Sequence, residues 1–179
     1  MTHLTTRRLT LRPYTSDDAP LMHRLIGDLR VFFWRTEPAT LEEVETLIAQ
    51  DIIRHAEQGL GAWAVFKADE FVGQVILQPL PETGEPEIGY HFVPEAQGHG
   101  YATEAALELL RHGFIGLNLP RIVAVVLPDN LPSQKVMKKL GLRYEKDIMK
   151  ADMRHNYFAF ERDDYIQSTA PSSLSSSRS

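Results

Sequence analysis

The stretch HFVPEAQGHGYATEAALELL, His91–Leu110, constrains the fold more than any other part of the sequence. An apolar run typical of a strand ends at Pro94, which cannot donate a ladder hydrogen bond, so regular pairing should stop there. Gly98 and Gly100 follow, and a helix then begins with no acidic residue in its first turn. The unpaired N–H groups at such a helix start attract an anion, and two glycines let it approach the backbone closely. The stretch therefore predicts a strand, an anion-binding loop and a helix in direct succession.

The segments before this stretch predict two helices and a meander. A strand is expected over Arg7–Thr15 and a helix over Ser16–Leu29, with Ser16 as its N-cap. A longer helix is expected over Leu41–Gly59, ended by the glycine. Its apolar stripe consists of Val44, Leu47, Ile48 and Ile52. Three apolar runs separated by turn residues, GAWAVFKAD, EFVGQVILQPL and PEIGYHFV, then predict an antiparallel meander.

The segments after the stretch complete one domain. The run RIVAVVL is rich in β-branched residues, as in strands buried on both faces, and LPSQKVMKKLG predicts a short helix closed by Gly141. The runs LRYEKDIMK and NYFAFERDD predict the last strands. We therefore expect a single α+β domain over residues 1–166, with a mixed, mostly antiparallel twisted sheet flanked by helices. The serine-rich residues 167–179 lack core side chains and are expected to form a disordered tail.

Composition excludes several classes of function. The chain has 179 residues and a net charge of -5, which argues against broad binding to nucleic acid or to a membrane surface. It has no cysteine, so disulfides, thiol nucleophiles and thiolate metal sites are excluded. No apolar run approaches the ~20 residues needed to cross a bilayer, and the N-terminus has no signal-peptide core. The cytoplasm is the expected compartment.

Nucleotide-binding motifs match the glycine loop poorly. The letters GHGYAT nearly fit the dinucleotide pattern G-x-G-x-x-G/A, but the third position is Thr103. The next strand begins at Arg121 and contains no acidic residue, and no G-K-[ST] motif occurs in the chain. The meander before the loop also differs from the parallel unit that a dinucleotide fold needs.

Gln97, Gly100 and Ala102 instead spell Q-x-x-G-x-A, which resembles the pyrophosphate loop of the GNAT superfamily of N-acetyltransferases. Three segments in the same order resemble the branch with the Rim-type ribosomal-protein N-terminal acetyltransferases: RRLTLRPYTSDDAPLM, PEIGYHFVPEAQGHGYATEAAL and DNLPSQKVMKKLGL. The resemblance extends from about Leu9 to Glu161. It implies a single GNAT-type domain with a splayed central strand pair.

The resemblance also implies acetyl-CoA as cosubstrate and an acetyl transfer to a primary amine. Consecutive N–H groups from Gly98 to Thr103 would bind the pyrophosphate, and main-chain groups near Phe92 and Val93 would hold the pantetheine arm. No metal is expected. The predicted cofactor-binding residues are Phe92, Val93, Gln97, Gly98, His99, Gly100, Tyr101, Ala102, Thr103, Asn130 and Ser133.

Glu87, Ser133 and Asp152 are the predicted catalytic residues; the resemblance implies a place near the sulfur for Ser133 and one facing the substrate for Asp152. Glu87 shares one face of its strand with His91, and either a carboxylate or a histidine can serve as a base. Many relatives carry a tyrosine late in the helix after Asn130 as the acid for the leaving thiolate. This helix has none, which leaves that role to Ser133 or to water.

The sequence leaves open the identity of the acceptor amine, the alternative functions and the oligomeric state. The acceptor is a small-molecule or peptide amine, and the aromatic residues Phe32, Phe33 and Trp34 lie in the region that shapes the acceptor pocket in the family, although they can equally be core anchors. One alternative is a non-catalytic acyl-CoA-binding or regulatory module of the same fold. A dinucleotide-binding oxidoreductase is the other. No nucleic-acid or membrane partner is expected, and the sequence does not distinguish a monomer from a homodimer.

Overall fold

The computed structural model describes residues 3–171. The strands are β1 (Leu4–Thr5), β2 (Thr10–Pro13), β3 (Gly61–Lys67), β4 (Glu70–Pro79), β5 (Pro86–Phe92), β6 (Arg121–Val126), β7 (Arg143–Lys150) and β8 (Met153–Glu161). The helices are α1 (Ala19–Ile26), α2 (Leu41–Gln58), α3 (Tyr101–Arg111), α4 (Leu131–Leu140) and α5 (Arg162–Thr169). Short 3₁₀ turns, η1 (Ser16–Asp18) and η2 (Pro94–Ala96), precede α1 and the glycine loop, and a π-helical turn, η3 (His112–Gly116), extends α3.

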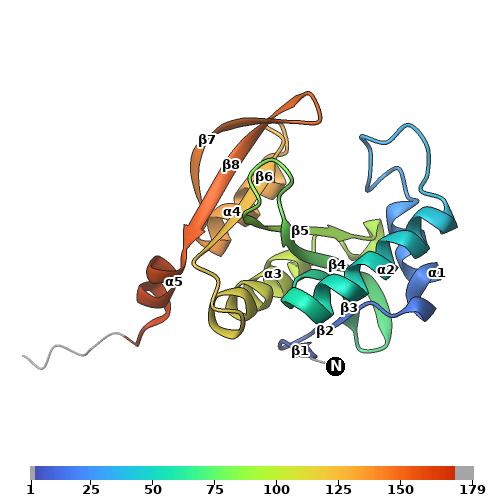
Figure 1. The fold of residues 1–179 in the computed structure, drawn as a ribbon, viewed down its shortest axis with the longest axis horizontal. Coiled ribbons are helices and arrows are strands. Elements are labelled where there is room, and N and C mark those ends of the chain that lie inside the picture. Colours follow the sequence, from blue (N-terminus) through green and yellow to red (C-terminus); the bar gives the residue numbers. More distant parts are fainter. Residues whose placement is uncertain (1–2, 172–179) are drawn as a thin grey trace, which may run out of the picture.

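These strands form a mixed sheet in the order β1-β2-β3-β4-β5-β6-β8-β7 (Figure 1). Strands β3, β4 and β5 form the predicted antiparallel meander, with Val75 opposite Tyr90 between β4 and β5. Strand β6 pairs parallel to β5 and antiparallel to β8, and it lies inside the sheet, as its β-branched sequence predicts. The expected α+β class and the mostly antiparallel sheet are confirmed.

A continuous apolar core joins the helices to the sheet. Leu25 of α1, Val44 and Ile48 of α2, and Leu109 and Leu110 of α3 are fully or almost fully buried. The predicted stripe of α2 is wrong at Leu47 and Ile52, which are 43% and 42% exposed. Asp51 is buried in that helix instead, because Arg54 of the next turn donates to its carboxylate.

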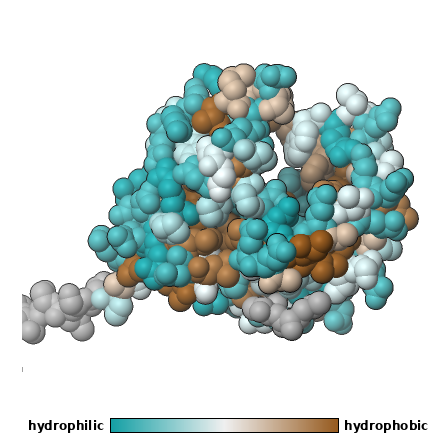
Figure 2. All heavy atoms as spheres, viewed as in Figure 1, coloured by the Kyte–Doolittle hydropathy of each residue, from teal (hydrophilic) through white to brown (hydrophobic). Residues whose placement is uncertain are grey.

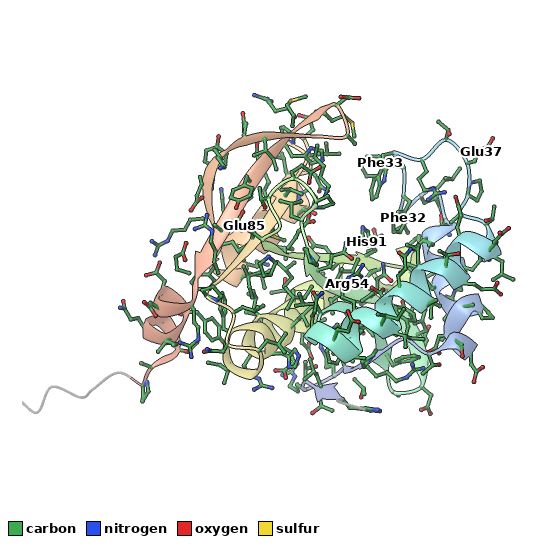
Figure 3. All side chains as sticks on the ribbon, in the orientation of Figure 1. Phe32, Phe33, Glu37, Arg54, Glu85 and His91 are labelled. Carbon is green, nitrogen blue, oxygen red and sulfur yellow. The ribbon has the colours of Figure 1, made fainter. Side chains whose placement is uncertain are left out.

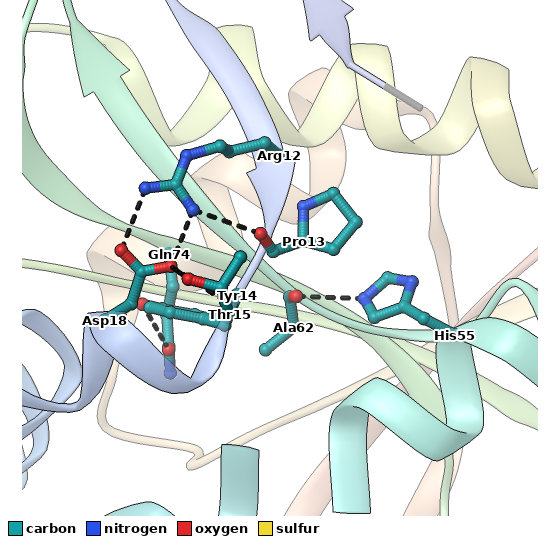
Figure 4. Close-up of polar contacts among 8 residues, drawn as sticks. All are labelled: Arg12, Pro13, Tyr14, Thr15, Asp18, His55, Ala62 and Gln74. Atoms are coloured by element: carbon teal, nitrogen blue, oxygen red, sulfur yellow. Dashed lines mark hydrogen bonds and ion pairs between the residues drawn. The ribbon is translucent and has the colours of Figure 1, made fainter. Parts of the chain in front are cut away.

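The start of the first helix also differs from the prediction. Residues Ser16–Asp18 form a 3₁₀ turn rather than the first turn of the α-helix, so Ser16 is not the N-cap. The Asp18 carboxylate accepts hydrogen bonds from the Thr15 N–H and hydroxyl (2.8 Å each) and from the Arg12 guanidinium (Figure 4). Burial raises the pKa of Asp18, but these hydrogen bonds outweigh it and lower the pKa to about 2. Thus the turn is fixed by an ion pair that the sequence pattern did not reveal.

The C-terminal segment continues beyond the expected domain boundary. Helix α5 extends to Thr169, so the first residues of the predicted tail 167–179 are helical. Residues 172–179 lie outside the described residues. In the described part of the chain, no helix is long and apolar enough to cross a membrane.

Candidate active site

A cleft of about 860 Å³ opens between the turn that joins β7 to β8 and the loop of residues 27–40 between α1 and α2. Figure 1 shows these two segments facing each other across the molecule, and the space-filling view shows the surface hollowed between them (Figure 2). Strand β5, the glycine loop and helix α4 supply the rest of the lining. Among the described residues, no group of three or more His, Asp or Glu side chains is arranged to hold a metal ion.

The cleft exists because β5 and β6 separate. Strand β5 pairs with β4 along its whole length but with β6 at one position, Glu87 opposite Val123. Beyond Glu87 the two strands diverge, as the family resemblance predicts. Side chains alternate between the two faces of a strand, so Glu87, Gly89 and His91 lie on one face and Ile88, Tyr90 and Phe92 on the other.

The first face carries a half-buried carboxylate. Both Glu87 oxygens accept hydrogen bonds from the Lys150 ammonium at 3.2 Å, and the Glu87 side chain is 13% exposed. Burial raises the pKa of Glu87 above its ordinary value, because it disfavours the charged form, and Lys150 offsets part of this rise. Glu87 is therefore an ionisable group whose affinity for a proton is increased, as a general base requires.

His91 lies on the same face and is held by neighbours on three sides. The Phe32 ring packs on the imidazole at 4.4 Å between centroids, and the Trp34 ring lies 5.9 Å away. Figure 3 shows Phe32 and Phe33 in the loop of residues 27–40, which borders the cleft, with Phe32 near His91. The Gln74 amide donates to His91 Nδ1 (3.5 Å), and the Tyr14 hydroxyl donates to Gln74 Oε1 (3.0 Å; Figure 4).

These contacts give His91 a defined protonation state. Burial lowers the pKa of His91 to about 4, so the ring is neutral at physiological pH. The Gln74 amide nitrogen lies 3.5 Å from Nδ1 and can only donate, which favours the tautomer with the ring proton on Nε2. A ring in this state is a poor proton acceptor, which favours Glu87 over His91 as the base.

The opposite face carries a pair of hydroxyl groups. The Tyr90 hydroxyl donates to Ser133 Oγ at 3.0 Å, which joins β5 to helix α4 across the gap. Burial raises the pKa of Tyr90 and the Ser133 hydrogen bond offsets part of the rise, so the phenol stays protonated. Asn130 caps α4 by accepting from the Ser133 N–H (3.2 Å). The Ser133 oxygen accepts from Tyr90, so its own proton can be donated to a bound group.

The glycine loop has the geometry that the sequence predicts. Gly98 and Gly100 have φ values of 75° and 78°, in the left-handed region, and α3 begins at the next residue, Tyr101. The prediction of an acid-free first turn is wrong, because Glu104 lies in that turn. Its carboxylate accepts from Arg8 Nε (2.6 Å) and from the Thr6 hydroxyl (2.6 Å), so its charge is compensated on the side of β1.

Most of the predicted site residues lie together. Those that line the cleft are Glu87, Phe92, Gln97, Gly98, Gly100, Tyr101, Ala102, Thr103, Asn130 and Ser133. The Gln97 amide donates to the Phe92 carbonyl (3.0 Å), which closes the glycine loop onto the end of β5.

Three predicted residues are not part of the lining. Both main-chain groups of Val93 are used, because its N–H donates to Val72 O (3.0 Å) and its carbonyl accepts from the Ala96 N–H (2.9 Å). The His99 ring stacks on Tyr101 (5.4 Å) outside the cleft, so a role for His99 rests on its main chain alone. Asp152 lies exposed in the β7–β8 turn with φ 59°.

The position of Val93 has a consequence for the backbone. Hydrogen bonding in an antiparallel ladder alternates in direction, and the Val93 N–H points to β4. The main-chain groups of Tyr90 and Phe92 therefore point away from β4, toward the gap, and those of His91 toward β4. Of the predicted pair, Phe92 and not Val93 presents a main-chain N–H to a ligand in the gap, while the Phe92 carbonyl accepts from the Gln97 amide.

The sequence analysis missed two residues of the site. Tyr90 was available from the alternation of the strand, which places it on the face opposite Glu87. Lys150 has no local signal, because its contact with Glu87 depends on how the β7–β8 turn reaches across the sheet.

Comparisons with known proteins agree with this geometry. The family described as an acetyltransferase (GNAT) domain matches residues 8–143. The uncharacterized N-acetyltransferase YnaD of Bacillus subtilis (strain 168) is 34% identical over 146 residues, 80% of this chain and 84% of that protein. The spermidine N(1)-acetyltransferase of Escherichia coli (strain K12) is 29% identical over 152 residues, 83% of this chain and 77% of that protein.

Among solved structures, RimL, a ribosomal-protein alpha-N acetyltransferase in complex with coenzyme A, superposes with a TM-score of 0.76. The superposition covers 89% of this chain and 98% of that chain at 19% identity, which shows a common fold. The predicted resemblance is thereby confirmed in its family, and structural neighbours include the Rim-type branch. The chain belongs to the GNAT family and is an N-acetyltransferase.

Proposed function

We propose that this N-acetyltransferase moves an acetyl group directly from acetyl-CoA to a primary amine, with Glu87 as base and Ser133 as acid. The observation that carries the proposal is the placement of Glu87 and the Tyr90–Ser133 pair on opposite faces of β5, at the gap between β5 and β6. A proton acceptor on one side of a thioester and a proton donor on the other are what direct transfer needs.

The gap and the glycine loop provide the groups that bind CoA. The main-chain N–H groups from Gly98 to Thr103 would bind the pyrophosphate at the start of α3, with the helix dipole as the positive end. The peptide-like pantetheine arm would pair with the backbone of Tyr90 and Phe92 and contact Asn130 on α4. The predicted boundary of the catalytic domain, residues 1–166, falls inside helix α5, so the proposed domain extends to the end of that helix at Thr169.

On the amine side, Glu87 removes a proton so that the neutral amine can attack, directly or through one water. The nitrogen forms a bond to the acetyl carbonyl carbon, and the resulting oxyanion is stabilised by a main-chain N–H of β5 that points into the gap. Lys150 keeps the half-buried Glu87 carboxylate paired and oriented.

On the thioester side, the carbon–sulfur bond breaks and the electron pair leaves with the sulfur. Ser133 donates its hydroxyl proton to this thiolate, while the Tyr90 hydroxyl donates to Ser133 Oγ. Overall, an ammonium group and acetyl-CoA give an amide, the CoA thiol and one proton. Glu87 accepts the first proton of the ammonium group and passes it to solvent, and the second proton, lost from the nitrogen as the carbon–sulfur bond breaks, returns through water to Ser133 in place of the one given to the thiolate. Asp152 has no part in this scheme, because it lies outside the cleft lining.

The acceptor is a small-molecule or peptide amine. Relatives include a spermidine acetyltransferase, and the RimL structure belongs to an enzyme that acts on a protein N-terminus. Both classes are therefore candidates. The alternative, a non-catalytic acyl-CoA-binding module, would keep the glycine loop but would have no need of a base and a hydroxyl donor pair on the two faces of β5.

The test is release of CoA from acetyl-CoA in the presence of a panel of amines, followed with a thiol reagent. The protein has no cysteine, so the reagent reports CoA alone. We expect amine-dependent release above hydrolysis, an acetylated amine by mass spectrometry, and no acetylated protein with acetyl-CoA alone. Calorimetric binding of CoA without turnover of any amine would favour the non-catalytic module. Failure to bind CoA would contradict the assignment of the cosubstrate.

A further inference from the structure

The face of β5 with Glu87 contains an open position at Gly89. A Cβ added to Gly89 would meet no atom within 4 Å. Residues two apart in a strand are separated by about 7 Å, so Gly89 lies about that far from Glu87 on one side and from His91 on the other. An amine above Gly89 can therefore approach the gap between β5 and β6 while Glu87 remains within reach through a water.

The His91 end of this open position is bordered by aromatic rings. Phe33 and Trp34 line the cleft and are 60% and 48% exposed, whereas every other Phe and Trp of the described residues is buried or half-buried. The rings hold one another in place, because the centroid of the Trp34 ring lies 5.0 Å from that of Phe32 and 5.1 Å from that of Phe33. Phe33 and Trp34, named here the aromatic wall and backed by Phe32, offer apolar area that a bound molecule would bury.

The charges of the cleft are unfavourable for an acceptor with several ammonium groups. Glu87 is the one carboxylate among the residues that line the cleft, whereas Arg30, Lys139 and Lys150 are cationic. Both Glu87 oxygens already accept from Lys150, and Arg30 is paired with Asp28 at 2.6 Å. A second ammonium group would lose water without gaining a carboxylate partner.

Resting on the proposed function, we propose that the acceptor is a primary amine joined by a short spacer to an aromatic or bulky apolar group, and that polyamines are poor acceptors. The apolar group packs on the aromatic wall, and the amine lies over Gly89. The distance of about 7 Å between His91 and Gly89 suits a spacer of two or three carbons. The acidic net charge of the whole chain does not extend to the lining of this cleft.

The test compares 2-phenylethylamine, propylamine and spermidine as acceptors, with kcat/KM corrected for the fraction of neutral amine. We expect 2-phenylethylamine to exceed both others by about tenfold or more, because its ring buries apolar area. Trp34→Ala and Phe33→Ala should each remove most of this preference, because kcat/KM for 2-phenylethylamine should fall much more than kcat/KM for propylamine. Gly89→Ala should slow all three amines without weakening CoA binding, which also shows that the variant is folded.

Leu47→Ala is the matched control, since Leu47 is an exposed apolar residue of α2 outside the cleft. It should keep the wild-type preference. A preference of the wild-type enzyme for spermidine, or an equal effect of Trp34→Ala and Phe33→Ala on all three amines, would overturn the inference and leave the proposed function intact. Cation–π contact between the rings and the ammonium groups of spermidine would produce the preference for spermidine and so would overturn the inference. Absence of turnover with every amine would instead overturn the proposed function, and this inference with it.

Discussion

The two faces of strand β5 are bounded by different kinds of structure. The face with Tyr90 meets α3 and α4, two helices whose starts are fixed by a left-handed glycine and by the Asn130 cap. The face with Glu87 and His91 meets two irregular segments, the loop of residues 27–40 and the β7–β8 turn. One face is built from local, regular elements and the other from segments brought together by the fold.

Under the proposed function, this difference separates two tasks of the enzyme, the binding of CoA and the selection of the acceptor. A cosubstrate that is the same throughout the family suits a site made of backbone groups and helix ends, which depend little on side chains. An acceptor that differs between enzymes suits a site made by loops, because loops change without disturbing the sheet. Substitutions on the two faces should therefore affect different kinetic constants.

The largest effect is expected from Glu87→Gln on the face of β5 with Glu87 and His91, called here the acceptor face. The amide keeps the shape of the carboxylate but cannot accept the proton of the amine, so kcat/KM should fall by roughly 10²–10⁴. CoA affinity, measured by calorimetry, should barely change, and the acidic limb of the pH–rate profile should disappear. A loss below about tenfold, confined to the acceptor KM, would mean that Glu87 orients the amine and that the base lies elsewhere.

The next effect concerns the glycine loop and has a matched control. Gly98 and Gly84 have φ values of 75° and 74°, and a Cβ at either meets no atom within 4 Å. Alanine at each should cost about 1–2 kcal/mol of stability, because both conformations are left-handed. Only Gly98→Ala puts a methyl group where the pyrophosphate must approach, so its Kd for CoA should rise about ten- to a hundredfold.

In this glycine pair, thermal melting measures the shared strain and calorimetry measures CoA affinity. Equal CoA affinity in the two variants would show that the loop does not bind the pyrophosphate.

A smaller effect is expected from removing the hydroxyls of Tyr90 and Ser133, on the other face of β5, to which CoA is assigned in the proposed function. Ser133→Ala should lower kcat by about tenfold with little change in the acceptor KM, since water replaces the serine as a less well-placed acid. Tyr90→Phe should have a weaker effect. Because Tyr90 acts through Ser133, the double variant should be no slower than Ser133→Ala alone. Independent, multiplying losses would indicate that the two hydroxyls do not work as one unit.

The sequence predicted the local structure of the Tyr90 face of β5 well for a physical reason. The glycine loop, the start of α3 and the Asn130 cap are set by residues a few positions apart, so their motifs can be read locally. The same holds for the meander and for the strand β6, where alternation and β-branching indicate burial.

The acceptor face was less predictable because its contacts are distant in sequence. The Glu87–Lys150 pair joins residues 63 positions apart, and the tautomer of His91 depends on Gln74 in the neighbouring strand. Val93 was assigned to the pantetheine arm on its position after β5, but the direction of its N–H follows from the pairing register with β4. Asp152 was predicted from the family resemblance, and it lies exposed in a turn with φ 59° and not in the cleft lining.

The smallest effect, and the sharpest test of how the acceptor face is tuned, is expected from Lys150→Met. Burial raises the pKa of Glu87 and Lys150 lowers it, so removal of the ammonium should raise this pKa further. Glu87 works as a base when it is ionised, and its activity is lost as the pH falls through its folded pKa. The acidic limb of kcat/KM should therefore move to higher pH.

Above this limb the rate of Lys150→Met should fall by less than about tenfold, because the carboxylate is still present. Stability at neutral pH should also decrease, since the half-buried Glu87 carboxylate loses its partner, and this loss should shrink as acid protonates Glu87. Lys146→Met is the control, because the Lys146 ammonium lies over the Tyr157 ring at 5.1 Å and outside the cleft lining. An acidic limb that stays in place in Lys150→Met but disappears in Glu87→Gln would mean that Lys150 orients the base without setting its charge.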